Sequence, residues 1–344
     1  MKLDNGFYAV ISHLNNKYQS INKIFEIKDK DNIIVYDFAE SFLPHLLDIC
    51  LEPSNTNKLS STDEPFIWSF LQSNTNNYIT EKIIKMPLKP GDKFFNIYRP
   101  LLTPQIMNGT FNIIDNIPSI DNYVDSIPIS NQEYNNLLCQ FEIVLDDLIN
   151  VFKTVAPYQK NKNCFGHNIR NVIILACTEI DAMMQNILKK NKIKSIGRFY
   201  TTKDYYKLVE ILKLKDYSIR FRRYHDLNEI TPFKNWDQAR STRSLAWYDS
   251  YNRIKHDREK EFELANIENA INSVAAYAIT LIAQFGYRNI LWNNKINQII
   301  EILAEPQWKI EDFYIPRRSS DTISELYEDA IPYPKELLRE HCTT

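Results

Sequence analysis

The scarcity of glycine is the feature that most restricts what this chain can fold into. The sequence contains 6 glycines, where average usage of about 7% would give roughly 24 in a chain of this length. Loops that wrap a phosphate group need backbone with positive φ, which glycine adopts at little steric cost. The sequence therefore argues against a Rossmann or P-loop nucleotide site.

Length and charge narrow the class of protein further. A chain of 344 residues is long enough for two domains of ordinary size. Its 44% hydrophobic content can form a core, and a net charge of −2 argues against a protein that coats nucleic acid. The first twenty residues lack the apolar core of a signal peptide. The longest apolar stretch, Val274 to Ala283, is too short to cross a membrane. We expect a cytoplasmic protein.

The cysteines and the other ligand-type residues give no sign of a metal or cofactor. The 5 cysteines form no CxxC pair and are odd in number, which favours free thiols in a reducing compartment over a zinc site or a disulfide framework. No cluster of carboxylates or histidines has the spacing of a metal site. We expect no cofactor and no metal.

The first 125 or so residues are typical of strands and loops. Short runs rich in β-branched and aromatic residues lie between clusters of Asn, Asp, Ser and Pro. These runs predict strands at Phe7–Ile11, Ile33–Phe38, Phe94–Tyr98 and Phe111–Ile114. A turn is predicted at Met86–Asp92, and a short helix is expected at Ala39–Ile49.

Beyond residue 127 the apolar residues take helical spacing. Ser130–Glu133 has the spacing of a capping box. Apolar positions recurring every three or four residues then predict helices. The predicted ranges are 130–152, 168–190, 244–285 with a break near 257–263, and 292–304. Shorter elements are expected between them, namely a capped helix from Thr201 to Leu214 and an exposed strand or arm at Tyr217–Tyr224.

These patterns predict an α+β fold. We expect a β-rich sensing or interaction domain at 1–127 and a helical bundle at 128–290. A C-terminal helix and an irregular tail would follow at 291–344, the tail held by Trp308, Phe313 and Tyr314.

The segment from Gln185 to Arg223 is strongly basic. It holds twelve Lys and Arg against three acidic residues, with four tyrosines among them. Phosphate neutralisation and base stacking would use this combination. A solvated helix face with its tyrosines turned inward would use it as well, so both interpretations stay open.

The segment from Ser244 to Arg258 carries the residues best suited to chemistry. On a helical wheel, Trp247, Tyr251 and Ile254 form a packed side. Asn252, Arg253, Lys255 and His256 lie together on the opposite side. Arg258 falls on the packed side, where a carboxylate such as Glu179 could pair with it.

Such a face could cleave RNA without a metal. A histidine with a pKa of about 6.5 can take a proton from a ribose 2′-hydroxyl or deliver one to a leaving 5′-oxygen. Arg253 and Lys255 could neutralise charge that develops on the phosphate. Asn252 could orient the ribose or the imidazole. The alternative is that His256 and Asn252 only cross-link neighbouring helices.

Two stretches of the helical region resemble the HEPN superfamily. They are Ile-Leu-Ala-Cys-Thr-Glu-Ile-Asp at 174–181 and Trp-Tyr-Asp-Ser-Tyr-Asn-Arg-Ile-Lys-His-Asp-Arg at 247–258. The likeness covers about residues 130–290 and implies an all-α bundle of four to five helices. Active members are metal-independent endoribonucleases of toxin and antiviral systems. They dimerise so that two Arg-x(4–6)-His motifs face one cleft, and their products carry a 2′,3′-cyclic phosphate and a 5′-hydroxyl.

The resemblance assigns roles to residues of this chain. His256 matches the motif histidine, and Arg253 precedes it with two residues between them where the family has four to six. The resemblance implies a HEPN-type endoribonuclease of phage defence or a toxin system, with catalytic His256 and Arg253 and with Asn252, Lys255 and Arg258 binding substrate.

Two other functions remain open. Some members of the superfamily bind RNA or nucleotides without cutting, and others act only as interaction modules. The partners expected are RNA, a second copy bound through the helical domain, and a regulatory protein. The N-terminal domain would then sense a trigger or restrain the nuclease.

Overall fold

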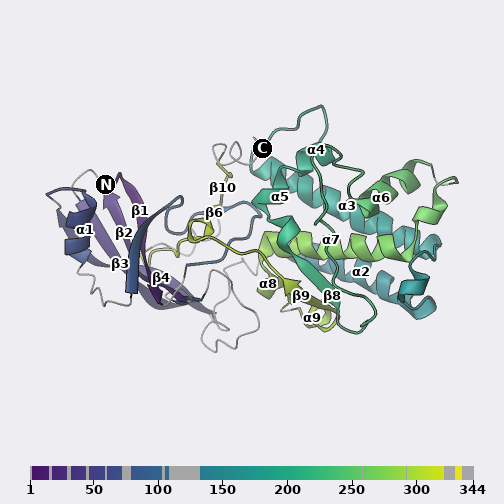
Figure 1. Cartoon of the computed structure of the whole chain (residues 1–344), viewed down its shortest axis with the longest axis horizontal. Coiled ribbons are helices and arrows are strands. Elements are labelled where there is room, and N and C mark those ends of the chain that lie inside the picture. Colours follow the sequence, from purple (N-terminus) through teal and green to yellow (C-terminus); the bar gives the residue numbers. More distant parts are fainter. Residues whose placement is uncertain are drawn as a thin grey trace. The chain divides into compact units, whose positions relative to one another are not determined.

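The computed structural model divides the chain into two compact units (Figure 1). The described residues are 2–14, 18–28, 32–43, 46–58, 60–71, 79–102, 105–107, 132–257, 259–291, 293–320 and 330–334. Within these, the first unit takes in residues up to 93, 99–107, 307–320 and 330, and the second takes in 94–98, 132–306 and 331–334. The α+β fold class predicted from the sequence is confirmed, with a sheet in the first unit and helices in the second.

The first unit is built on an antiparallel sheet. The strand order is β4-β3-β2-β1-β5, and the short strand β7 pairs with the beginning of β2. One helix, α1 (Glu64–Leu71), follows the hairpin of the two longest strands. The strands are β1 (Gly6–Leu14), β2 (Tyr18–Lys28), β3 (Asn32–Leu43), β4 (Leu46–Lys58), β5 (Ile79–Met86) and β7 (Gln105–Met107).

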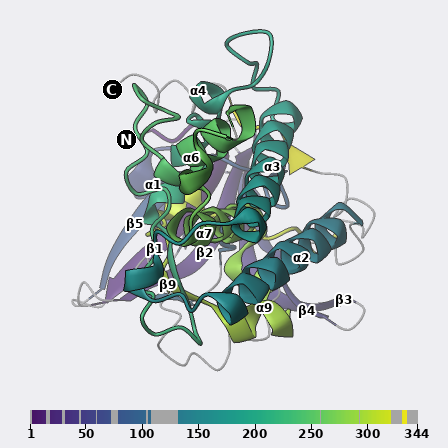
Figure 2. The same ribbon diagram turned by 90° about the vertical axis from the view of Figure 1, so that its right-hand side faces the viewer.

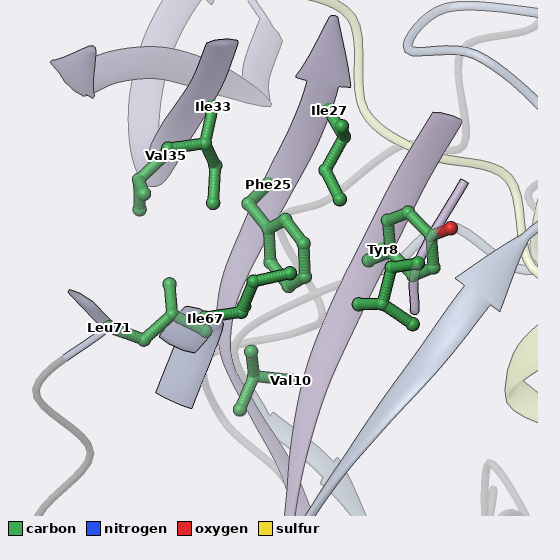
Figure 3. Packing of buried hydrophobic residues seen from close by; sticks show 9 residues of the cluster. Tyr8, Val10, Phe25, Ile27, Ile33, Val35, Ile67 and Leu71 are labelled. Atoms are coloured by element: carbon green, nitrogen blue, oxygen red, sulfur yellow. The ribbon is translucent and has the colours of Figure 1, made fainter. Parts of the chain in front are cut away.

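The core of this unit lies between the sheet and α1. Alternate residues of a strand point to the same face, and Figure 3 shows such pairs from β1, β2 and β3 converging on two side chains of α1. The rings of Tyr8 and Phe25 stack at 5.1 Å between centroids. The labelled members of the cluster are Tyr8, Val10, Phe25, Ile27, Ile33, Val35, Ile67 and Leu71.

Residues 307–320 pack on the first unit as an irregular segment. The amide of Leu51 donates to the carbonyl of Arg317, and the amide of Ser319 donates to the carbonyl of Leu51. One short 3-10 helix, η4 (Ile310–Asp312), interrupts the segment. The three aromatic residues expected to hold it, Trp308, Phe313 and Tyr314, are all buried.

Two predictions for the first half of the chain are wrong. Residues 39–43 and 46–49 are not a helix but the facing ends of β3 and β4, where Ala39 pairs with Cys50. The cross-strand partner overrides a weak local helix preference. In Phe94–Tyr98 only Phe94 is in a strand, the two-residue β6 (Lys93–Phe94), and Asn96 at φ 53° breaks the extended run. The strand predicted at Phe111–Ile114 lies outside the described residues.

The second unit is centred on α7 (Ile267–Phe285), which is buried along almost its whole length. It packs against α2 (Gln132–Thr154), α3 (His167–Lys190) and α6 (Ala246–His256), as Figures 1 and 2 show. The apolar stripes predicted for these helices are their buried faces. The break predicted near 257–263 separates α6 from α7 and contains η3 (Phe262–Leu264).

Short elements complete the second unit. They are η1 (Gln159–Asn161), α4 (Thr202–Tyr205), α5 (Leu208–Ile211), η2 (Leu214–Asp216), β8 (Ser218–Phe221), α8 (Tyr287–Leu291), α9 (Asn294–Ile299) and β9 (Ile300–Ala304). The remaining strand, β10, comprises Ala330–Ile331. The helix cap predicted at Thr201 is present, as a capping box with Asp204. The single helix predicted from there to Leu214 is wrong, because turns divide this range into α4, α5 and η2.

The antiparallel pair of β8 and β9 corrects three predictions. The helix expected over 292–304 ends at Ile299, and residues 300–304 form a strand. In that strand the buried residues Ile300 and Ile302 alternate with more exposed ones, the period of a sheet. Its partner β8 is mostly buried and not an exposed arm. The second unit is therefore mainly helical but not all-α.

Candidate functional site

The site predicted from the sequence lies on α6. The helix starts after Leu245, whose backbone is extended, and ends at His256. Trp247, Tyr251 and Ile254 are buried, as the helical wheel predicts. The indole of Trp247 donates to the carbonyl of Pro232 at 3.0 Å, which anchors the buried side of the helix.

The opposite side of α6 carries the candidate residues together. Asn252 is half-buried, and Arg253, Lys255 and His256 are exposed. Asn252 and His256 are four residues apart and therefore share one face of the helix. Arg258, predicted to pair with Glu179, lies outside the described residues.

Arg253 is held by two carboxylates. One guanidinium nitrogen, Nη2, donates to Glu261 at 2.5 Å, and Nη1 lies 3.8 Å from Asp249. The hydrogen bond to Glu261, with the charges of Glu261 and Asp249, raises the pKa of the guanidinium. Arg253 thus joins α6 to the turn that follows it, and a phosphate would compete with these carboxylates for its charge.

Lys255 folds back over its own helix. Its Nζ donates to the hydroxyl of Tyr251 at 2.9 Å and lies 4.9 Å from the centroid of the same ring. The hydrogen bond to Tyr251 raises the pKa of Lys255. An ammonium group has three donors, so this contact leaves two of them for another acceptor.

His256 is the last residue of α6 and is exposed. Within the part of the chain that the structure describes, its side chain has no hydrogen bond or ion pair. An imidazole in this position can exchange a proton with a bound molecule without first breaking an internal contact.

The sequence did not predict the carboxylate of Asp181, which contacts the buried side of α6. The hydroxyl of Tyr248 donates to Asp181 on α3 at 2.5 Å, and the hydroxyl of Tyr251 lies 3.4 Å from the other carboxylate oxygen. Burial raises the pKa of Asp181, against the opposing effects of the tyrosine hydrogen bonds and the Lys255 charge. Asp181, Tyr251 and Lys255 therefore form one polar chain from α3 to the surface.

A signal for Asp181 was present in the sequence. It lies at the edge of the buried face of α3, four residues after the buried Cys177 and three before the buried Met184. A carboxylate on a buried face needs partners, and the nearby tyrosines of α6 supply them.

The ion pair expected between Glu179 and Arg258 is not tested, because Arg258 lies outside the described residues. No ion pair joins it to a cation in the described ranges, and burial raises its pKa. It borders an open pocket of about 540 Å³ whose other lining residues are on α2, namely Gln132, Glu133, Asn136, Leu137 and Gln140.

A second and more enclosed pocket lies elsewhere in the helical unit. It has a volume of about 340 Å³ and is bordered by the loop after α2, residues 226–231, Asn235 and the first turns of α7. None of the residues predicted for the site lines it.

The basic segment 185–223 has features of both a solvated helix face and a surface for nucleic acid. Tyr205 and Tyr217 are buried, as an inward-turned face requires. Several cations are engaged by acids, such as Lys207 by Asp204 and Arg220 by Glu301. Other cations of the segment are exposed and form no ion pair with a carboxylate of the described residues. Most of them lie between the last turn of α3 and the start of α4.

The described residues offer neither a metal site nor a membrane span. Among these residues, no three or more His, Cys, Asp or Glu side chains gather as a metal site would require. No helix in the described ranges is long and apolar enough to cross a membrane. Comparison with protein-family models, with curated proteins and with solved structures found no match. The HEPN resemblance stays a prediction.

Proposed function

We propose that this protein is a HEPN-type, metal-independent endoribonuclease of a phage-defence or toxin system, acting in the cytoplasm. The observation that carries the proposal is the exposed imidazole of His256 at the end of α6, on the same face as Asn252. The aromatic packing beneath this face supports it, because a rigid helix positions a catalytic group more accurately than a loop.

The reaction needs only groups that the chain itself supplies. His256 as general base takes the proton of a ribose 2′-hydroxyl, and the 2′-oxygen attacks the adjacent phosphorus. The bond from phosphorus to the 5′-oxygen breaks, and an imidazolium donates a proton to that oxygen. The products are a 2′,3′-cyclic phosphate and a 5′-hydroxyl. One imidazole cannot be base and acid in the same step, so we propose a homodimer that places two copies of His256 in one cleft.

The neighbouring residues take different roles in this proposal. Lys255 has ammonium hydrogens that Tyr251 leaves unused, and it is the cation we assign to the phosphate. Asn252 orients the ribose or the imidazole. Arg253 is held by Glu261 and Asp249, so we assign it chiefly to positioning the turn beyond His256.

An RNA cleavage assay in EDTA tests the proposal. Purified wild-type protein and a His256→Ala variant are incubated with mixed tRNA and mRNA. We expect cleavage by the wild type alone, with cyclic-phosphate ends recognised because a phosphatase removes the terminal phosphate only after acid has opened the ring. The exposed His225 provides a matched control, and His225→Ala should cleave like the wild type. Equal cleavage by His256→Ala would refute the assignment of His256.

The ion pairs of Arg253 favour a second candidate function. If both carboxylates keep the guanidinium occupied, the helical unit binds RNA or a nucleotide without cutting it. Wild-type protein that retains RNA but leaves it intact, in the dimeric state and with any regulatory partner removed, would favour this function over the nuclease. Binding of neither RNA nor nucleotide would favour a plain protein-interaction module.

A further inference from the structure

The segment from the end of α3 to the start of α4, residues 189–203, differs from the rest of the helical unit in charge, and we call it the α3–α4 turn. Residues 189–203 contain six cations and no acid. Lys190 is paired with Glu133. The other five are exposed, and no carboxylate of the described residues lies within ion-pair distance of them: Lys189, Lys192, Lys194, Arg198 and Lys203.

The same turn exposes two large hydrophobic side chains. Ile196 is 69% exposed and Phe199 is 70% exposed, the highest values among the large hydrophobic residues that the structure describes. The guanidinium carbon of Arg198 lies 5.2 Å from the centroid of the Phe199 ring. Exposed apolar groups surrounded by charge are typical of an interaction surface.

The turn is held in this form by a buried carboxylate. Asp204 accepts hydrogen bonds from the backbone amides of Ile196, at 2.7 Å, and Thr201, at 3.0 Å. It also accepts one from Lys207 at 3.1 Å. The hydroxyl of Tyr200 donates to the carbonyl of Ile193 at 2.9 Å. The backbone is therefore tied at several points while Ile196 and Phe199 point away from the core.

The charge of Asp204 strengthens these ties. Burial alone would raise the pKa of Asp204, but the hydrogen bonds from Ile196, Lys207 and Thr201 outweigh it and hold the pKa below its ordinary value. The carboxylate is therefore charged at neutral pH, and its hydrogen bonds to the turn are of the stronger, charge-assisted kind.

We propose that residues 189–203 bind single-stranded RNA. The five cations that lack a carboxylate partner complement a phosphate backbone, and the exposed ring of Phe199 offers a platform on which an unpaired base can stack. Bases within a duplex are already stacked, so a single strand or a loop is the form that this surface fits. The inference rests on the proposed function in taking RNA as the ligand, and it adds the form of the substrate and a binding surface separate from α6.

A lipid membrane is the competing partner. One aliphatic and one aromatic side chain offer little apolar area for insertion, and stable attachment of a protein to a membrane usually takes two signals. Five cations around one exposed aromatic ring fit RNA, which carries both phosphates and bases, better than a lipid surface. Lipid vesicles therefore serve as a second probe.

Fluorescence anisotropy with a labelled 20-nucleotide uridine or adenosine RNA tests the proposal. All proteins carry His256→Ala so that the RNA stays intact. We expect Phe199→Ala to weaken binding about 5- to 150-fold, the range for loss of one stacked base. Charge reversal at Lys192, Lys194 and Arg198 should weaken binding further. It should also reduce the slope of log binding constant against log salt concentration by about 2, since each single-strand phosphate contact contributes about 0.7.

Matched variants test whether RNA binding depends on this surface in particular or on any exposed ring and any exposed cations. Tyr158→Ala removes another exposed ring, 47% exposed. Charge reversal at Lys153, Lys160 and Lys234 changes three exposed cations outside the turn. Both controls should bind RNA like the parent protein. A duplex of the same length should bind more weakly than the single strand and should not respond to Phe199→Ala.

The outcomes distinguish this inference from the proposed function. RNA binding that the turn variants leave unchanged would overturn the inference while cleavage by the wild type still stood. Binding that depends on the turn, without cleavage, would support the inference and refute the nuclease. Binding to vesicles of phosphatidylserine and phosphatidylcholine with no binding to RNA would overturn the inference in favour of a membrane surface.

Discussion

The hydroxyl of Tyr248 on α6 donates a hydrogen bond to the carboxylate of Asp181 on α3, at 2.5 Å. This contact fixes the helix that carries the candidate site to the neighbouring helix. Through Tyr251, the same carboxylate also supports Lys255. The exposed face of α6 therefore depends on a carboxylate that lies beneath it.

Removing this carboxylate should destabilise the protein. Asp181→Ala leaves the hydroxyls of Tyr248 and Tyr251 without their acceptor, and a buried group left unsatisfied costs about 1–3 kcal/mol. Asp181→Asn keeps an acceptor and should lose less. Urea unfolding measures both, with the exposed Glu210→Ala as control. An Asp181→Ala variant as stable as the control would show that the contact does not support α6.

Arg253 and Glu261 should act as a unit in RNA cleavage. If Arg253 positions the turn beyond His256, then Arg253→Ala and Glu261→Gln should lower kcat to a similar extent. The double variant should be no worse than either single variant, because residues that act together are non-additive. Cleavage kinetics on one RNA substrate measure this.

An opposite result would assign Arg253 to the phosphate. Glu261→Gln would then release the guanidinium and leave kcat unchanged or raise it, while Arg253→Ala would still lower it. Lys260→Ala, in which an exposed cation of the same turn is lost, serves as the control and should cleave like the wild type.

The stability contribution of Asp204 should depend on pH. Its pKa in the folded protein lies below the ordinary value, so the stabilisation is fully present above the unfolded pKa of about 3.9. It is lost as the pH falls through the lower folded pKa. The difference in free energy of unfolding between wild type and Asp204→Asn should be constant from pH 7 to about 5 and shrink below about 4. Urea titrations across this range would contradict the assignment if the difference grew on acidification.

Gly286 should not tolerate a side chain. It ends α7 with φ 83°, and a Cβ there would lie 2.6 Å from a ring carbon of Tyr98, whose amide donates to the carbonyl of Ala283. Backbone strain of this kind costs about 1–3 kcal/mol, and the overlap adds to it. Gly286→Ala should therefore lower the free energy of unfolding by at least that amount in urea titrations.

A matched glycine provides the control for this substitution. A Cβ at Gly197 would have no neighbouring atom within 4 Å, and the φ of Gly197 is not positive. Gly197→Ala should change stability little. Equal effects of the two substitutions would show that the approach of Tyr98 to Gly286 does not constrain the end of α7.

Local patterns in the sequence determined the long helices and parts of two strands. The helical spacing of apolar residues predicted α2, α3 and α7 to within a few residues, and the alternating runs predicted parts of β1 and β3. Periodicity reports which side of an element is buried, and this holds wherever the element packs. The same reasoning placed Trp247, Tyr251 and Ile254 on the buried side of α6.

Tertiary structure alone decided the rest. Residues 39–43, 46–49 and 300–304 became strands because β-pairing partners distant in sequence, or across a hairpin, were available to them. The partners of Arg253 and Asp181, and the exposure of Phe199, depend in the same way on residues that the folded chain brings together. A sequence pattern carries the preference of a segment for burial, whereas the identity of its neighbours is set only when the whole chain folds.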